Sequence, residues 1–316
     1  MPENFADRLL QTIAERRTPA VVALDPVYER LPAEITAHRD LNDAEDAEAA
    51  LDAVLEFCRN VIQIVAPLVP AIKINSAYFE RYYGEGIEGY YDLVQEAADR
   101  GLIVIGDVKR GDVGHSSDCY AAAHLLDSPF VNRPDLIAPD AITINGYFGG
   151  DGVRPFVGAA RDTGRGLFVL VRTSNESSRE IQDLPLADGR AVHEAVAQRV
   201  AEWACEPDLV GQRGYSAIGA VVASRDAAAA RRLRELMPQS LFLVPGYGAQ
   251  GMTAEQCAPY FRSDGSGAIV AAGRSVIYAF DVPSYRERYA SDWKQCVAHA
   301  CRDFIGDLSR VVRIGS

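Results

Sequence analysis

Charged side chains interrupt or follow several apolar segments that are typical of buried strands. Three of these segments read AVVALDP from Ala20, PAIKIN from Pro70 and LIVIGDVK from Leu102. The charged residues at the ends of such segments are Asp25, Lys73, Asp107, Lys109, Arg172 and Arg274. An ion pair or a turn cap explains any one of them alone, but their shared position predicts a single polar site.

The densest of these groups is the segment GDVKRGD, which starts at Gly106. Asp107 and Lys109 are two residues apart on a predicted strand, so their side chains point to the same face. Asp112 lies beyond the strand and after a glycine, so it need not face the same way. A carboxylate beside an ammonium group can do acid–base chemistry. A solvated acid–base turn is the alternative explanation of this motif when it is taken alone.

Glycines in the segment PGYGAQG indicate a phosphate-binding loop. Gly246, Gly248 and Gly251 spell the dinucleotide fingerprint GxGxxG, but they follow the seventh predicted strand instead of opening a Rossmann domain. The loops after strands seven and eight of a barrel frequently bind phosphate through backbone N–H groups. Gln250 and Arg274 then supply side-chain donors, the arginine as a bidentate partner. Glycines that only form turns are the alternative explanation.

Eight short apolar segments along the chain predict eight strands. They end in polar or glycine-containing turns and alternate with longer amphipathic or alanine-rich segments. The eight segments start at Ala20, Pro70, Leu102, Ala141, Gly166, Ser216, Leu241 and Ala268. The predicted helices span residues 43–69, 77–100, 189–205, 226–237 and 284–308.

This alternation predicts a parallel sheet, and the nearly continuous apolar strands predict that both of its faces are covered. Eight units favour a (β/α)8 barrel, or TIM barrel, over a doubly wound sheet. No linker divides the chain, so we expect residues 1–316 to form a single domain, with the barrel core at about 20–280 and a C-terminal helix over 284–308. The surplus over the usual size of about 250 residues falls in four long connections whose roles the sequence does not indicate. They are residues 27–42, 128–140, 176–188 and 206–215.

The composition is that of a globular protein that can bury a core. Of 316 residues, 48% are hydrophobic and 24% are charged, and the formal net charge is −12. This acidic balance excludes binding of nucleic acid or of an anionic membrane through the overall field, although local positive charge can still bind a small anion. The six cysteines show no metal-binding framework. No apolar stretch approaches the roughly 18 residues of a membrane span or resembles a signal peptide, so we expect a cytoplasmic protein.

Taken together, these motifs resemble those of the orotidine 5′-phosphate decarboxylase family. The resemblance rests on Asp25, Lys73, DVKRGD from Asp107, GAQG from Gly248 and GRSVI from Gly273. It is greatest for the longer bacterial members, which have DxKRGD at the third strand and an aromatic segment after the second-strand lysine. The resemblance implies decarboxylation of orotidine 5′-monophosphate (OMP) to uridine 5′-monophosphate (UMP), the last step of de novo pyrimidine biosynthesis.

The resemblance also implies a role for each site residue. Asp25 and Lys73 would contact the ribose hydroxyls, and Asp107 and Lys109 would lie beside the substrate carboxylate and the carbon that loses it. Ser174 would bind the pyrimidine edge, although the adjacent threonine is an alternative. The phosphate ligands would be Gln250, Gly273 and Arg274.

A neighbouring subunit would complete the site if the resemblance holds. Asp112 and the hydroxyl residue four positions beyond it, Ser116, would reach into the active site of a second copy. This implies a homodimer with shared active sites.

The chemistry of the reaction is consistent with these residue types. Loss of CO2 from a pyrimidine carbon leaves a carbanion with no adjacent electron sink, so the enzyme must supply a preorganised field and a proton. Lys109 can stabilise the developing charge and then act as general acid. Asp107 beside the departing carboxylate opposes the ground state, since two unit charges 4 Å apart repel by about 4 kcal/mol at an effective dielectric of 20. We expect no metal and no organic cofactor.

The residues alone leave three other functions open. A related barrel that acts on sugar phosphates through a metal-stabilised enediolate would share the DxK motif and the phosphate loops, but Lys73 stands where further carboxylates for Mg²⁺ would be needed. An NADP-linked oxidoreductase would use the GxGxxG glycines and Arg274. A non-catalytic phosphate-binding barrel would need only the loops.

Several other residues near the motifs are more simply explained without chemistry. His115 follows the third-strand motif and could act as a base, but an expected loop position favours a solvated or interface histidine. Tyr78, Phe79, Tyr82 and Tyr83 have helical spacing, which favours packing or a dimer contact.

Overall fold

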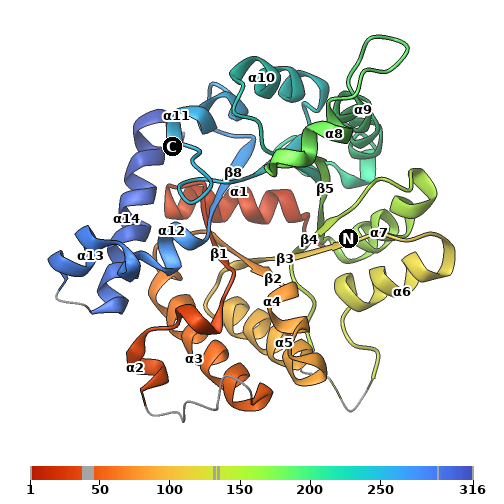
Figure 1. The fold of residues 1–316 in the computed structure, drawn as a ribbon. Coiled ribbons are helices and arrows are strands. Elements are labelled where there is room, and N and C mark those ends of the chain that lie inside the picture. The colour runs from red at the N-terminus through yellow and green to blue at the C-terminus, as the bar shows by residue number, and fades with distance from the viewer. Residues whose placement is uncertain (1, 38–45, 131–132, 134–135, 290–291, 315–316) are drawn as a thin grey trace.

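Eight parallel strands close into a barrel in the order of the chain, β1-β2-β3-β4-β5-β6-β7-β8 (Figure 1). The computed structural model describes residues 2–37, 46–130, 133, 136–289 and 292–314. The strands are β1 (Ala20–Leu24), β2 (Ala71–Asn75), β3 (Ile103–Arg110), β4 (Ala141–Ile144), β5 (Gly166–Arg172), β6 (Ser216–Val222), β7 (Ser240–Pro245) and β8 (Ala268–Ala272). Each predicted apolar segment forms one strand, so the predicted (β/α)8 barrel is confirmed.

Helices surround the barrel and connect its strands. The α-helices are α1 (Phe5–Arg16), α2 (Ala33–Thr36), α3 (Ala47–Val65), α4 (Ala77–Glu80), α5 (Tyr83–Asp99), α6 (Gly114–Leu125), α7 (Gly150–Thr163), α8 (Arg179–Gln182), α9 (Val192–Ala204), α10 (Ala227–Leu236), α11 (Ala254–Cys257), α12 (Arg274–Ile277), α13 (Pro283–Arg288) and α14 (Trp293–Val311). Short 3-10 helices are η1 (Tyr28–Arg30), η3 (Glu176–Ser178), η4 (Pro207–Leu209), η5 (Ala258–Tyr260) and η6 (Ala279–Asp281).

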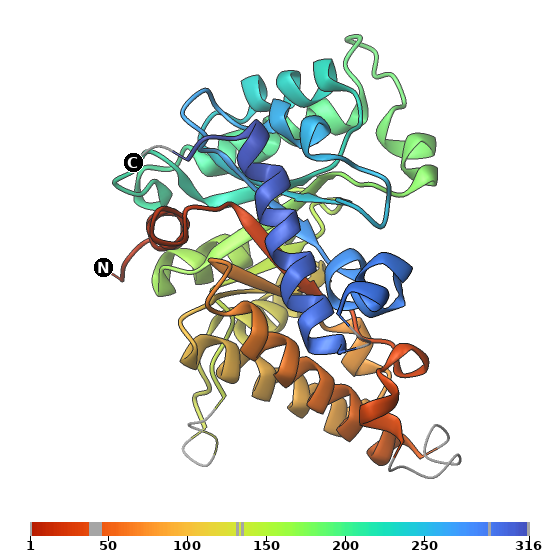
Figure 2. The same cartoon turned by 90° about the vertical axis from the view of Figure 1, so that its left-hand side faces the viewer.

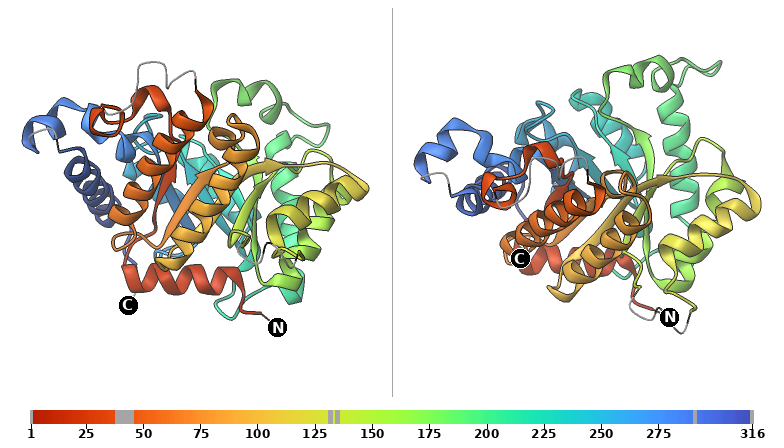
Figure 3. Two further views of the ribbon diagram at one scale, coloured as in Figure 1. Left: turned by 90° about the horizontal axis from the view of Figure 1, so that it is seen from below. Right: turned by 60° about the horizontal axis from the view of Figure 1, so that its bottom comes forward.

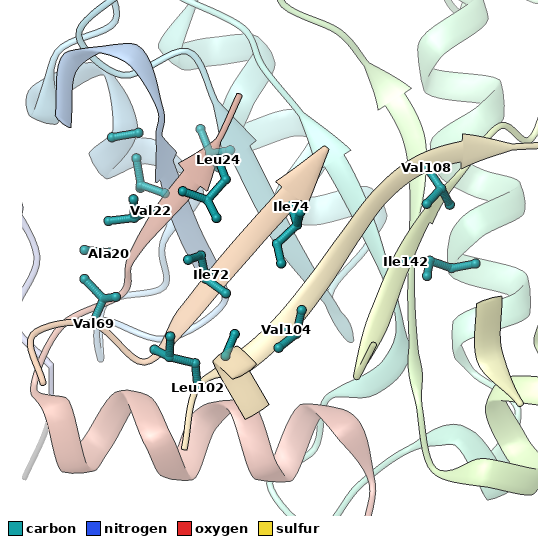
Figure 4. Close-up of a cluster of buried hydrophobic side chains, with 14 of the residues drawn as sticks. Ala20, Val22, Leu24, Val69, Ile72, Ile74, Leu102, Val104, Val108 and Ile142 are labelled. Carbon is teal, nitrogen blue, oxygen red and sulfur yellow. The ribbon is translucent and has the colours of Figure 1, made fainter. Parts of the chain in front are cut away.

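The outward face of each strand packs against the helices. Successive side chains in a strand alternate between the two faces, so every second residue faces outward. Figure 4 shows such residues from four adjacent strands, all buried in one hydrophobic cluster. They are Val22, Leu24, Ile72, Ile74, Val104 and Ile142.

The inward residues change from apolar to polar along the strands that build the site. In β2, Ala71 belongs to the interior hydrophobic core, whereas the next inward residues are Lys73 and Asn75. In β3, the inward residue Ile105 is followed by Asp107. Because parallel strands end at the same rim, their polar ends converge at the carboxyl-terminal mouth of the barrel.

Helix α1 closes the opposite, amino-terminal end of the barrel, and it was not predicted from the sequence (Figure 3, left). Asn4 caps the helix by accepting a hydrogen bond from the Ala6 N–H. Phe5 enters the interior core, where its ring meets Phe168 edge to face at a centroid distance of 5.8 Å. A Cβ atom at Gly166 would lie 2.2 Å from the Phe5 ring, so this contact requires glycine.

Several predicted helices have different bounds in the structure. The C-terminal helix expected over 284–308 is two helices, α13 and α14, because Asp292 caps a new helix by accepting a hydrogen bond from the Gln295 N–H. Helix α14 then runs along the outside of the barrel and contacts α3 (Figure 2). The helix expected over 77–100 is broken between α4 and α5, where Tyr83 adopts a left-handed φ of 58°. The expected start of the helix over 43–69 lies outside the described residues.

Three of the four long connections contain short helices within the described residues. Connection 27–42 holds η1 and α2, 176–188 holds η3 and α8, and 206–215 holds η4. Residues 38–42 of the first connection, and 131–132 and 134–135 of connection 128–140, lie outside the described residues. Within the described residues, no helix combines the length and the apolar character needed to cross a membrane.

Replacing Phe5 by alanine should lower the free energy of unfolding by about 3–5 kcal/mol, because removal of the buried ring would leave a cavity at the amino-terminal end of the barrel. The control is Phe130→Ala at a side chain that is 67% exposed, which should change stability by no more than about 0.5 kcal/mol. Urea denaturation of both variants measures the difference. Equal midpoints would show that α1 is not part of the core.

Candidate active site

A cavity of about 550 Å³ opens at the carboxyl-terminal mouth of the barrel. Strands β1 to β4 contribute to its wall, and so do the turns after β5, β7 and β8. The predicted site residues that line it are Asp25, Lys73, Asp107, Lys109, Ser174, Gln250, Gly273 and Arg274. The structure thus brings residues from most of the sequence to one surface.

Asp107 lies between two lysines at the base of this cavity. Its Oδ2 accepts a hydrogen bond from Lys73 Nζ at 2.5 Å, and its Oδ1 accepts one from Lys109 Nζ at 2.5 Å. The Thr143 hydroxyl also donates to Asp107 Oδ1, at 2.9 Å. Lys73 Nζ lies 3.6 Å from Asp25 Oδ1. Acidic and basic groups therefore alternate, so that each buried charge has a partner.

Burial and pairing act in opposite directions on the pKa values of this network. Burial alone would raise the pKa of Asp107, but Lys73 and Lys109 outweigh it and hold the pKa below its usual range. Burial alone would lower the pKa of Lys73, but Asp25 and Asp107 outweigh it and raise the pKa. Asp107 and Lys73 are therefore both charged at neutral pH.

The two lysines differ in their access to the cavity. The Lys73 side chain is 8% exposed, whereas the Lys109 side chain is 49% exposed. Lys73 is fixed among buried groups and keeps Asp107 ionised. Lys73 also lines the cavity, but Lys109 presents the more accessible ammonium group to a bound molecule.

Lys109 reaches its position through an irregularity in β3. Between Gly106 and Arg110, β3 advances four residues while its partner β4 advances two. Lys109 itself adopts a left-handed φ of 47°, which is uncommon for a residue other than glycine. Its N–H donates to the Thr143 hydroxyl at 3.0 Å. The alternation of side chains along a strand predicted the correct face for Lys109, but it did not predict this backbone conformation.

The loops after β7 and β8 pack closely at another side of the cavity. Gly248 has a φ of 69°, and a Cβ atom there would lie 2.7 Å from the Ser275 side chain. A Cβ atom at Gly273 would lie 2.9 Å from Asp25 Oδ2. The side chains of Gln250 and Arg274 are exposed at this end of the cavity, where they can donate hydrogen bonds to an anion.

Hydrogen bonding distinguishes Thr173 from Ser174 in the turn after β5. The Thr173 hydroxyl donates to Asn175 Oδ1 at 2.6 Å and accepts from Gln182 Nε2 at 2.8 Å. The Ser174 side chain also lines the cavity but makes no such pair of contacts with the described residues. The hydroxyl of Ser174 is therefore the more available of the two.

A second cavity, of about 760 Å³, adjoins the first beside the turn after β5. The two cavities share Thr173, Ser174, Asn175, Gly246 and Gln250, but the larger one does not contain the charged residues of β2 and β3. We place the chemistry in the smaller cavity because the paired charges lie there.

Asp112 and Ser116 line neither of these two cavities. Asp112 Oδ1 accepts a hydrogen bond from the adjacent Val113 N–H, and Ser116 is exposed on α6. The loop position expected for His115 is wrong, since the residue lies in the first turn of α6 with a side chain that is 91% exposed. Within one chain, these residues are separate from the lysines and from Asp107.

Comparison with known proteins identifies the family. Residues 19–288 match the family described as "Orotidine 5'-phosphate decarboxylase / HUMPS family". The chain belongs to this family. It is 36% identical over 278 residues to the orotidine 5′-phosphate decarboxylase of Caldicellulosiruptor bescii, with 88% of this chain and 90% of that protein covered. It is 34% identical over 304 residues to that of Rhodopirellula baltica, with 94% and 96% covered.

Solved structures of the same family have the same fold. The structure of Leishmania donovani OMP decarboxylase is similar with a TM-score of 0.69 and 26% sequence identity, over 99% of this chain and 100% of that chain. The resemblance inferred from the motifs is therefore confirmed. The dinucleotide-binding alternative is not supported, because the GxGxxG glycines follow the seventh strand of a closed barrel.

In this member of the OMP decarboxylase family, Tyr78 lines the cavity, a position that the sequence did not predict. It belongs to α4 and lines the cavity near Asp25, and burial raises its pKa, with a further contribution from Asp25. The packing expected for Phe79 and Tyr82 is confirmed, and Tyr78 also packs against the core, whereas Tyr83 is 76% exposed. Grouping four aromatic residues by helical spacing concealed the different position of Tyr78.

A second polar cluster supports the strand end next to Lys109. Arg110 pairs with Glu80 at 2.5 Å, and the Ser76 hydroxyl donates to the same carboxylate at 2.6 Å. Arg110 Nε lies 3.4 Å from His124 Nε2. Burial, together with the positive charge of Arg110, lowers the pKa of His124 to about 4. His124 is therefore neutral at pH 7 and can accept the hydrogen bond from Arg110.

This histidine should make stability depend on pH in the acidic range. The imidazole has an ordinary pKa of 6.5 and a pKa of about 4 in the fold, so the unfolded chain binds more protons between these values. The contribution to stability is complete above pH 6.5 and is lost as the pH falls, at up to about 1.4 kcal/mol per pH unit. His124→Gln should flatten this slope in urea denaturation between about pH 4.5 and 7.

The matched control for that measurement is His115→Gln, because the His115 side chain is exposed. This variant should keep the wild-type slope. A slope that is unchanged in the His124 variant would show that burial of the neutral imidazole does not govern acid stability.

Proposed function

We propose that the protein decarboxylates OMP to UMP and CO2, in the last step of de novo pyrimidine biosynthesis. The observation that carries this proposal is the Asp107 carboxylate held between Lys73 and Lys109 at the mouth of the barrel. The family match and the named relatives support the same substrate and reaction. A cytoplasmic location, expected from the sequence, stays a prediction.

The distribution of lysine supports a proton-transfer role for the site. Three of the 32 basic residues are lysines, namely Lys73, Lys109 and Lys294, and the others are arginines. Two of the three meet at Asp107, and the third is exposed on α14. Arginine stays protonated in proteins, whereas a lysine ammonium can give up a proton.

We assign the parts of the nucleotide to separate sides of the cavity. The phosphate ligands are Gln250, Gly273 and Arg274. Asp25 and Lys73 bind the ribose hydroxyls, because both residues line the cavity and the Asp25 side chain is 22% exposed. Ser174 binds the pyrimidine edge, since the Thr173 hydroxyl is engaged elsewhere.

The chemical step needs charge stabilisation and one proton. The bond between the pyrimidine carbon and the carboxyl carbon breaks, CO2 leaves, and the electron pair stays on the ring carbon. The Lys109 ammonium stabilises this charge, donates its proton to the carbon, and regains a proton from water. The Asp107 carboxylate repels the carboxylate of the bound substrate, and binding energy from the contacts with the phosphate and the ribose offsets this repulsion. This mechanism requires no metal and no organic cofactor.

We also propose a homodimer in which Asp112 and Ser116 complete the site of the partner subunit. Neither residue lines the cavity of its own chain. Phe148 and Asp112 both lie next to Gly152. A Cβ atom built at Gly152 would lie 2.7 Å from the Asp112 carbonyl oxygen and 2.9 Å from Phe148 Cβ. Large apolar side chains exposed around this position are typical of an interface. They are Val113, Tyr120, Tyr147 and Phe148.

Purified protein incubated with OMP and EDTA should lose the orotate-type ultraviolet absorbance as UMP forms. Lys109→Ala should lower kcat by about 10²–10⁴-fold, because the general acid is removed. Lys294→Ala, the same substitution at an exposed lysine, should keep wild-type activity. No turnover by the wild-type protein would refute the proposed function, and turnover that EDTA abolishes would favour the metal-dependent alternative.

Mixing two inactive variants tests the shared site. Lys109→Ala and Asp112→Ala chains should regain about a quarter of wild-type activity when subunits exchange, since half of the dimers are mixed and each has one intact site. The control mixture is Lys109→Ala with Asp107→Ala, which should regain none because both residues belong to the same chain's site. Absence of recovery in the first mixture, with subunit exchange verified, would contradict the shared site.

A further inference from the structure

Thr143 contacts both Asp107 and Lys109, the two residues to which we assign the chemistry. It lies in β4, faces the interior of the barrel, and is 1% exposed at the edge of the cavity. Its hydroxyl donates to Asp107 Oδ1 at 2.9 Å and accepts from the Lys109 N–H at 3.0 Å. One side chain therefore contacts the carboxylate of one residue and the backbone of the other.

The backbone of Lys109 depends on this acceptor. The regular ladder between β3 and β4 is interrupted between Gly106 and Arg110, so the Lys109 N–H lies in the irregular segment. The left-handed φ of 47° at Lys109 is strained for a residue that carries a Cβ. Leaving this partly buried N–H without an acceptor would add a further penalty. The Thr143 hydroxyl removes that penalty and so stabilises the strained conformation.

A hydroxyl is the group that can make both contacts at once. It has one proton to donate and two lone pairs that accept, whereas valine, which has the same shape, can do neither. Lys73 in β2 and Thr143 in β4 flank Asp107, because β2 and β4 are the two neighbours of β3 in the barrel. Both side chains point inward and contact Asp107 from opposite neighbouring strands.

We propose that Thr143 is a positioning residue that fixes Lys109 relative to Asp107 by holding the Lys109 backbone in its left-handed conformation. This inference rests on the roles of Asp107 and Lys109 in the proposed function. Thr143 acts through these two residues and is not itself a proton donor to the substrate. Its removal should therefore impair the chemical step and leave nucleotide binding nearly intact.

Thr143→Val should lower kcat for OMP by about 10- to 100-fold, because a small displacement of a catalytic group is sufficient for a loss of this size. The KM for OMP and the Kd for UMP should change by less than about threefold, since the assigned phosphate and ribose ligands are untouched. Thr143→Ser keeps the hydroxyl and should restore kcat to within about threefold of wild type. If the valine variant does not fold, Thr143→Ala removes the same hydroxyl and takes its place.

Thr18→Val is the matched control. Thr18 is also 1% exposed, and its hydroxyl accepts a hydrogen bond from the Ala20 N–H at the opposite end of the barrel. This variant should keep the wild-type kcat, and thermal unfolding of all variants reports any loss of stability.

Three results would overturn the inference: a wild-type kcat in Thr143→Val, a loss carried by KM, or a serine variant as impaired as the valine variant. Lys109→Ala, assayed in parallel, separates this failure from that of the proposed function. An inactive Lys109 variant beside a fully active Thr143→Val overturns the role of Thr143 alone. An active Lys109 variant overturns the proposed mechanism and the inference together.

Discussion

The buried carboxylate of Asp107 is the group on which the rest of the site depends. A charge that leaves water is costly unless other groups replace its hydration, and Asp107 receives three hydrogen bonds, from Lys73, Lys109 and Thr143. These donors come from β2, β3 and β4, which are neighbours in the barrel. A closed parallel sheet can bring such side chains together because inward positions of adjacent strands lie side by side.

The opposite end of the barrel shows how the fold tolerates this charged cluster. There the inward residues are apolar, and α1 covers them with Phe5. The outer faces of the same strands pack against helices through residues such as Val22 and Ile72. Stability therefore comes mainly from apolar burial at the amino-terminal end and around the barrel. The mouth is left free for polar groups that would be unfavourable in the core, and the overall charge of −12 does not prevent a local concentration of cations there.

The sequence predicted the strands and most cavity residues, because both follow from local patterns. Apolar segments with a charged end predicted the positions of Lys73 and Asp107 correctly. Thr143 was missed because a lone threonine in an apolar strand is ordinary, and its role depends on an interruption of the β3–β4 ladder that no local pattern encodes. Helix α1 was missed because it precedes the first strand and its purpose, closing the barrel, is visible only in three dimensions. The division of 284–308 into two helices depends on a cap at Asp292.

Two different constraints must act on Lys109 if it is to deliver a proton to one atom. Thr143 fixes its backbone from within the barrel, but a lysine side chain has several rotatable bonds beyond that point. Asp107 restrains the ammonium from one side, and the side chain is still 49% exposed. Asp112, the next carboxylate in the motif, accepts a hydrogen bond from the Val113 N–H and does not line the cavity. The proposed dimer would supply the missing restraint, because Asp112 of the partner subunit would continue the alternation of charges beyond Lys109. The hydroxyl within the chain and the carboxylate from the second chain thus act on different parts of the same residue.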